Sequence, residues 1–119
     1  MPPSTFSYDS ASLHCDSVPL AALADQHGTP LYVYSATAIR ENYRRLAAAF
    51  APLAPSIKFA LKANSNLAIL RLLKDEGAGF DVVSGGEIYR ALQAGAEAAS
   101  LSFAGVGKTD AELAYALKE

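Results

Sequence analysis

Apolar residues recur along the chain at helix and strand spacings, separated by glycine, proline and capping residues. The first predicted helix starts at Ser17, which can cap it, and has Pro19 in its first turn. Leu20 and Leu23 share one face of this helix, and Gly28 is its predicted stop. These signals predict a short helix over residues 17–28.

The preceding segment Met1–Asp16 has no periodicity, and we expect an irregular arm there. Leu31–Tyr34 is an apolar, β-prone run that predicts a strand, and Ser35 can cap the helix that follows. Apolar residues at spacings of four, three and four predict one buried face on that helix, which Pro52 and Pro55 end. The residues of this face are Ile39, Tyr43, Leu46 and Phe50.

A strand followed by a helix is then predicted three times. The strands are Ile57–Leu61, Phe80–Val83 and Leu101–Ala104. The helix starts are marked by Asn64–Asn66 and by capping-box spacings at Ser84–Glu87 and Thr109–Glu112, and Gly77 stops the first of these helices. Strands joined by helical crossovers are parallel, so the fold class is α/β, either a barrel or a doubly wound sheet.

The number of predicted strands is small for a barrel, because a (β/α)8 barrel has eight strands and about 250 residues. We therefore expect the chain to be the N-terminal portion of a longer protein, inactive and poorly folded alone. An open sheet forming a complete small domain is the alternative.

The composition is that of a globular protein, with 51% hydrophobic and 18% charged residues. A net charge of −2 gives no basic face for nucleic acid or anionic lipid. No apolar stretch approaches the roughly 20 residues that cross a bilayer. The N-terminus lacks the features of a secretory signal and Cys15 has no disulfide partner, so we expect a cytoplasmic protein with small-molecule or protein partners.

Lys62 is the strongest candidate for chemistry. It ends the first strand of the repeated units, and strand alternation places Lys58, the small Ala60 and Lys62 on one side. A lysine at the carboxyl end of a strand, walled by apolar residues, can become a nucleophile that forms a Schiff base. Spacing alone favours a solvated lysine, which is also our interpretation of Lys58.

Two acidic residues follow on the next strand and helix. Asp81 lies within an apolar strand, where it is either a neighbour of Lys62 or a hydrogen-bonded strand-end acid, and the pattern allows both. Glu87 fits the third helical position of a capping box with Ser84, which is sufficient to explain it.

The segment ending in Gly107-Lys108-Thr109 has the end of a phosphate-binding P-loop but not its start. Ser102 stands where the motif requires its first glycine, so ATP binding is not expected. Lys108 could face the same site as Lys62, although a solvated loop lysine is the simpler interpretation. His14 and His27 have no partners at metal-ligand spacing, and no metal site is predicted.

Several of these segments together resemble a known family, the alanine-racemase-like (fold type III) decarboxylases, which use pyridoxal 5'-phosphate (PLP). The matching blocks are Gly28–Tyr34, Phe59–Asn66, Gly77–Glu87 and Phe103–Thr109. Within the family, Lys-Ala-Asn-Ser-Asn and Gly-Val-Gly-Lys-Thr are similar to the diaminopimelate decarboxylases. The resemblance implies the first three βα units of a PLP-binding (β/α)8 TIM barrel over residues 36–119, with residues 1–35 joining a β-domain.

The resemblance also implies roles for individual residues. Lys62 would hold PLP as an internal aldimine beside Ala60, and Asp81 and Glu87 would lie close to the cofactor. The stacking histidine, the phosphate grip, the acid at the pyridine nitrogen and a cysteine from the second subunit would lie beyond residue 119, in a homodimer. A distal carboxylate binder, an arginine, is expected there too.

The implied reaction is decarboxylation of meso-2,6-diaminopimelate to L-lysine and CO2. Two alternatives stay open. One is a related decarboxylase acting on ornithine, arginine or carboxynorspermidine. The other is a non-catalytic PLP-binding homologue that retains Lys62.

Overall fold

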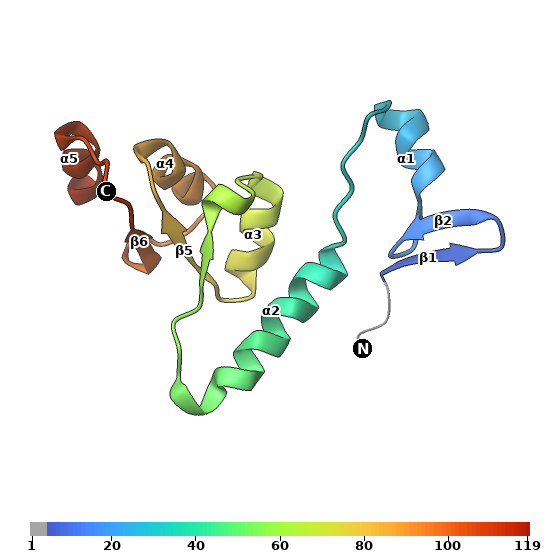
Figure 1. Ribbon diagram of the computed structural model, residues 1–119, viewed down its shortest axis with the longest axis horizontal. Helices are drawn as coiled ribbons and strands as arrows, with labels where there is room; N and C mark the ends of the chain where they lie inside the picture. Colours follow the sequence, from blue (N-terminus) through green and yellow to red (C-terminus); the bar gives the residue numbers. More distant parts are fainter. Residues whose placement is uncertain (1–4) are drawn as a thin grey trace. The chain divides into compact units, whose positions relative to one another are not determined.

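The computed structural model describes residues 5–119, which form two compact units, 5–42 and 43–119 (Figure 1). Each unit is described by itself. The helix α2 (Ala36–Phe50) begins in the first unit and ends in the second.

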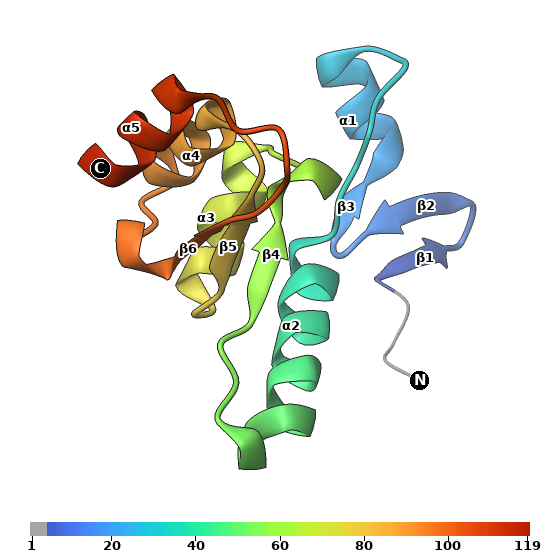
Figure 2. The same ribbon diagram turned by 60° about the vertical axis from the view of Figure 1, so that its left-hand side comes forward.

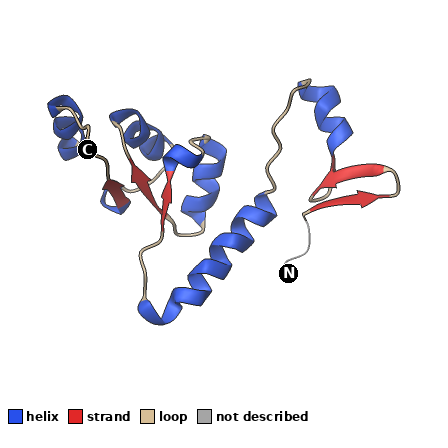
Figure 3. Ribbon diagram, in the orientation of Figure 1, coloured by secondary structure: helices blue, strands red, loops and turns tan. Residues whose placement is uncertain are grey.

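The first unit begins with a β-hairpin, drawn as a pair of red arrows in Figure 3. Strand β1 (Phe6–Asp9) pairs antiparallel with β2 (Ser12–Cys15), which also pairs with the two-residue β3 (Val18–Pro19). The prediction of an irregular arm over Met1–Asp16 is therefore wrong for residues 6–15, and residues 1–4 lie outside the described part. All of β1 is exposed, whereas β2 is half-buried and its Cys15 is buried. The alternating apolar residues Phe6 and Tyr8 pair with Cys15 and Leu13.

The helix predicted over 17–28 is confirmed, with a different start. Helix α1 (Leu20–His27) has Pro19 as the residue before its first turn, and no side chain caps it. Ser17 is therefore not the cap. Gly28 ends the helix with φ of 80°, a left-handed conformation that costs glycine little.

The strand predicted at Leu31–Tyr34 does not form. No residue in this segment pairs with another strand of the described chain, and Tyr32 is 87% exposed. A β-prone run without a pairing partner leaves its backbone groups to water, so propensity alone does not make it a strand.

Ser35 caps α2, as predicted. Its hydroxyl accepts a hydrogen bond from the Ala38 amide at 2.9 Å and donates one to the Asp16 carboxylate at 2.8 Å. The buried face predicted for α2 is not found, because no residue of this helix is buried and Leu46 and Phe50 are 46% and 47% exposed. The spacing of the apolar residues predicted the helix correctly, but spacing alone does not show whether another part of the protein packs on that face.

The second unit contains a three-stranded parallel sheet in the order β4-β5-β6, which confirms the predicted α/β class. Figures 1 and 2 both show α3 and α4 directly beside this sheet. The strands are β4 (Lys58–Ala60), β5 (Gly79–Val82) and β6 (Leu101–Phe103). The helices are α3 (Leu67–Asp75), α4 (Gly85–Gln93) and α5 (Asp110–Lys118), with short 3-10 turns η1 (Ala51–Leu53), η2 (Leu61–Ala63) and η3 (Ala98–Ser100).

The predicted helix starts of this unit are confirmed by their caps. Asn66 accepts from the Ala68 amide, Ser84 accepts from the Glu87 amide, and Thr109 forms a full capping box with Glu112. The residue after each cap starts a helix because an otherwise unsatisfied amide finds a partner there.

One face of the sheet forms the core with the helices. Its strand residues and the helix residues packed on them are apolar, and complete burial of such a side chain contributes about 1.5–3 kcal/mol. The largest fully buried side chains are Phe80, Leu61, Leu70 and Val82, and other buried helix residues are Ile69, Leu73, Ile88 and Ala91.

An ion pair joins the second half of α2 to the end of α3. Arg44 donates to both carboxylate oxygens of Glu76, at 2.6 and 2.8 Å. The Tyr43 hydroxyl has its pKa raised by burial and by the nearby Glu76 charge.

Within residues 5–119 no helix is long and apolar enough to cross a membrane.

Candidate active site

Lys62 lies two residues after the end of β4, in the 3-10 turn η2, and not within the strand as predicted. The turn is anchored by Leu61, which is fully buried, whereas the Lys62 side chain is exposed. Lys62 makes no hydrogen bond or ion pair with any residue of 5–119. Its amine is therefore free to react at the carboxyl end of a parallel strand, where α/β folds place their sites.

The loop after Lys62 is ordered by its own side chains. The Asn64 side-chain oxygen accepts from the Asn66 amide at 3.0 Å, and the Asn66 side-chain oxygen accepts from the Ala68 amide at 2.9 Å. The two asparagines form successive turns that hold the chain between Lys62 and α3.

Asp81 occupies the middle of the sheet. The strand register pairs it with Ala60 on one side and Ser102 on the other, and paired residues of parallel strands lie on the same face. The half-buried carboxylate has no hydrogen-bond or ion-pair partner within residues 5–119, so the alternative of a hydrogen-bonded strand-end acid finds no support there. Ala60 contributes only a methyl group between Asp81 and the turn that bears Lys62.

Glu87 binds the backbone at the start of α4. Its carboxylate accepts from the Val83 amide at 2.9 Å, and its own amide donates to the Ser84 hydroxyl at 3.2 Å. The capping box predicted for Ser84 and Glu87 forms only in part, because Ser84 caps the Glu87 amide but the Glu87 carboxylate accepts from Val83 and not from the Ser84 amide.

Lys58 is not the solvated lysine that we predicted. Its ammonium donates to the Ser102 hydroxyl at 2.7 Å, so the side chain crosses the central strand at Gly79, which pairs with Lys58. A Cβ on Gly79 would lie 3.2 Å from Lys58 Cγ and 2.6 Å from the carbonyl oxygen of Ser100.

Lys108 is held by its own loop. Its ammonium donates to the Gly105 carbonyl and lies 4.9 Å from the centre of the Phe103 ring. Phe103 pairs with the buried Val82, on the helix-covered face of the sheet. This bond is exposed to water, so Lys108 is a loop lysine, as the simpler interpretation predicted, and no contact with Lys62 is found within residues 5–119.

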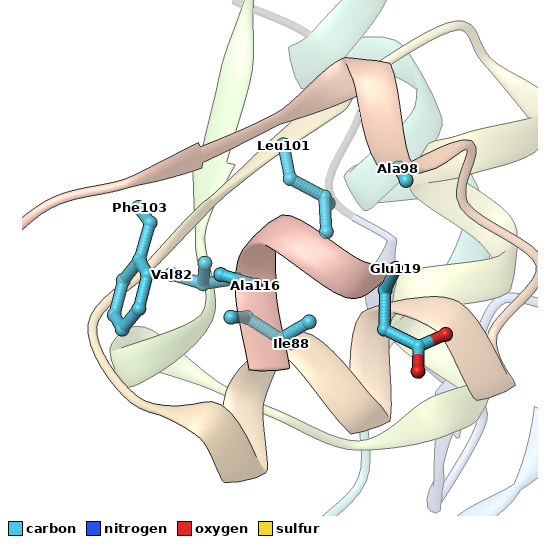
Figure 4. Close-up of a pocket in the computed structure, with 7 residues that line it drawn as sticks. All are labelled: Val82, Ile88, Ala98, Leu101, Phe103, Ala116 and Glu119. Carbon is cyan, nitrogen blue, oxygen red and sulfur yellow. The ribbon is translucent and has the colours of Figure 1, made fainter. Parts of the chain in front are cut away.

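A small cavity of about 120 Å³ also lies on the helix-covered face (Figure 4). Neither Lys62 nor Asp81 contributes to it. Its walls are apolar except for one carboxylate, and they consist of Val82, Ile88, Ala98, Leu101, Phe103, Ala116 and Glu119. This cavity is separate from the candidate active site.

The arrangement at the strand ends suits an aldehyde cofactor. A primary amine without a partner can bond covalently to an aldehyde carbon, and the nearby carboxylate of Asp81 can interact with a cationic group. The residues present therefore fit the attachment of pyridoxal phosphate at Lys62.

Comparisons with known proteins point to the same chemistry. The family model described as "Pyridoxal-dependent decarboxylase, pyridoxal binding domain" matches residues 36–119. The diaminopimelate decarboxylases of Neisseria meningitidis and Pseudomonas aeruginosa are 49% and 47% identical, over 89% and 96% of this chain. The crystal structure of diaminopimelate decarboxylase from M. jannaschii with L-lysine superposes with a TM-score of 0.89 at 36% identity, over 97% of this chain and 28% of that one.

The chain spans 26% and 28% of the length of the two curated relatives. The family match covers most of the chain and includes all three βα units and Lys62. The expectation of a PLP-dependent decarboxylase fold agrees with these matches. The chain therefore belongs to the pyridoxal-dependent decarboxylase family and matches its pyridoxal-binding domain.

Proposed function

We propose that the full-length protein is a PLP-dependent carboxy-lyase that converts meso-2,6-diaminopimelate to L-lysine and CO2. The observation that carries the proposal is the unpaired amine of Lys62 at the carboxyl end of β4, in a chain 47–49% identical to diaminopimelate decarboxylases. The L-lysine bound in the M. jannaschii structure supports an amino-acid ligand of this size and charge.

The residues of this chain have distinct tasks in the proposed reaction. PLP, when bound, supplies an electron sink for the carbanion left by departing CO2. Lys62 would hold the cofactor through its amine, and as a free amine it would hold or return a proton at its Nζ atom. Asp81 presents its negative charge from the neighbouring strand, and Ala60 leaves room between them. Glu87 fixes the start of α4 through Val83.

The proposal extends to assembly and location. We expect a homodimer with a shared active site in the cytoplasm, supported by the family resemblance and the biosynthetic class of the relatives. Light scattering of the purified full-length protein tests the dimer. The boundary between a β-domain segment at 1–35 and the barrel from residue 36 is part of the same proposal.

Borohydride reduction followed by peptide mapping tests the site. In the full-length protein loaded with PLP, we expect a phosphopyridoxyl group on Lys62. Lys62→Ala should lose this label and at least about a thousandfold of activity, because the covalent attachment is gone. Lys74→Ala is the matched control, since Lys74 lies on the surface of α3 beside Asp75 and should not alter labelling. A label on Lys58 or Lys108 would refute the assignment.

The substrate is tested separately. CO2 release is compared for meso-diaminopimelate, ornithine, arginine and lysine under identical conditions. Faster turnover of ornithine or arginine would replace the substrate and leave Lys62 in place. No turnover of any of them by a PLP-loaded protein would favour a non-catalytic homologue.

A further inference from the structure

Two side chains in the second unit bond to the backbone of a neighbouring strand–helix loop. The first is Glu112, on α5. One carboxylate oxygen accepts from the amide of Gly85 at 3.0 Å, and the other accepts from the amide and hydroxyl of Thr109, at 3.1 and 3.0 Å. Gly85 begins α4 and Thr109 caps α5, so one carboxylate joins the loops that follow β5 and β6.

The second side chain is Arg90, on α4. Its Nε donates to the carbonyl oxygen of Ser65 at 2.8 Å. Ser65 lies in the loop that follows β4, three residues after Lys62. Both contacts therefore run from a helix back to the preceding loop, and together they link all three loops at the carboxyl edge of the sheet.

Residues of α5 lie within ordinary van der Waals reach of Gly85. A Cβ on Gly85 would lie 3.4 Å from Glu112 Cγ and 3.7 Å from the ring of Tyr115 on the same helix. Bonds from three donors hold the pKa of Glu112 below its ordinary value, the Gly85 amide being the largest cause and the Thr109 amide the next. The carboxylate is thus ionised at neutral pH, where N–H bonds to it are stronger than bonds to a neutral acceptor.

We propose that Glu112 and Arg90 are positioning residues, which tie the three loops together and thereby fix the Lys62 turn relative to Asp81 and Glu87. The part of this inference that concerns the cofactor rests on the proposed function; the linkage of the loops does not. Glu112 carries the larger share, because its bonds are charge-assisted on the acceptor side and in part buried, whereas the Arg90 bond is exposed to water.

A purely local role for Glu112, as the capping partner of Thr109, is the competing explanation. The variant Thr109→Ala separates the two. It removes the hydroxyl that caps α5 and leaves both the Glu112 carboxylate and the Gly85 amide in place. Glu112→Ala removes the cap partner and the link to Gly85 together.

The experiment uses the full-length protein. Hydrogen exchange of the Gly85–Glu87 amides is measured without PLP, and PLP affinity is measured by absorbance titration. We expect Glu112→Ala to speed exchange at Gly85 by about tenfold, as loss of one stabilising hydrogen bond implies, and to weaken PLP binding several-fold. Thr109→Ala should leave both close to wild type. Arg90→Ala should show a smaller loss of PLP affinity, with Arg90→Lys restoring part of it.

Equal exchange in Glu112→Ala and Thr109→Ala would overturn the linkage and leave only a helix cap. Faster exchange with unchanged PLP affinity would overturn the positioning of the cofactor site. If the wild-type protein bound no PLP, the proposed function would fail, and the exchange data would still decide whether the loops are linked.

Discussion

The two faces of the β4-β5-β6 sheet differ in polarity and in burial. The helix-covered face is apolar and closed, with Phe80 and Val82 fully buried against α3 and α4. On the other face, a lysine pairs with a glycine toward the start of the strands, and an alanine, a carboxylate and a hydroxyl lie level with one another at the carboxyl end. Its residues are Lys58, Ala60, Gly79, Asp81 and Ser102.

The difference shows that one face of the sheet contributes stability and the other positions charged groups. Burial of the apolar face stabilises the three βα units through contacts that depend on shape and volume. The polar face contributes less burial and positions charged groups next to the turn that bears Lys62. Substitutions on the two faces should therefore differ in kind, with losses of stability on one and changes in specific bonds on the other.

The largest loss of stability is expected from Phe80→Ala. Phe80 is fully buried in the central strand, and removing its ring leaves a cavity, with an expected loss of about 3–5 kcal/mol in the free energy of unfolding. Urea denaturation of the full-length protein measures it. Val83→Ala, at a position 39% exposed on the same segment, is the control and should cost about 1 kcal/mol or less. Equal losses in Phe80→Ala and Val83→Ala would mean that the helix-covered face of the sheet is not the core.

Gly79→Ala is expected to have the next largest effect, because Gly79 on the polar face lies against the backbone of Ser100. The new methyl group would lie 2.6 Å from the Ser100 carbonyl oxygen, which cannot move without shifting β6. Overpacking of this kind costs about 1–3 kcal/mol. Gly107→Ala is the matched control, since nothing lies within 4 Å of its Cβ position. The measurement is the shift of the denaturation midpoint, and a neutral Gly79→Ala would contradict the close approach.

A double-mutant cycle on Lys58 and Ser102 tests the polar face itself. Lys58→Met keeps the aliphatic stem and removes the ammonium, and Ser102→Ala removes the acceptor. We expect each to destabilise the protein by about 0.5–1.5 kcal/mol, with Ser102→Ala the costlier because it leaves a half-buried ammonium without its partner. The coupling energy should be about 0.5–1 kcal/mol. Additive effects would show that the bond contributes nothing to stability.

The apolar face was largely predictable from the sequence and the polar face was not. Leu67, Leu70 and Leu73 have helical spacing, and Phe80–Val83 is a short apolar run, so local pattern was enough to predict the elements and their caps. The hairpin at residues 6–15 was missed because each of its strands has only four residues, the shortest run in which alternation indicates a strand. Leu31–Tyr34 was predicted as a strand and is not one, because pairing depends on the rest of the chain.

The site shows the same limit. Lys62 was predicted as the last residue of the first parallel strand and lies two residues after the end of that strand, because Leu61–Ala63 form the turn η2. The bonds from Lys58 to Ser102 and from Glu112 to Gly85 join residues 44 and 27 positions apart. Such contacts depend on strand register and helix packing, which spacing along one segment does not determine.

The smallest effect is expected at the carboxyl edge of the sheet. It concerns how the stability that Glu112 contributes depends on pH. The pKa of this carboxyl is lowered in the folded protein by its bonds to Gly85 and Thr109, from an ordinary value of 4.5. The unfolded chain therefore binds the proton more readily, and stability rises with pH between the two values. The contribution is complete above the pKa of the unfolded chain and is lost as the pH falls through the pKa of the folded protein.

In Glu112→Gln the side-chain amide can accept from Gly85 or from Thr109, but not from both, and it does not titrate in this range. We therefore expect this variant to be less stable than wild type at neutral pH and to approach it in acid, with the difference narrowing below about pH 4.5. Urea midpoints of both proteins, from about pH 7 to about pH 3.5, measure this. A difference that stays constant over that range would mean that the Glu112 charge does not contribute to linking the loops.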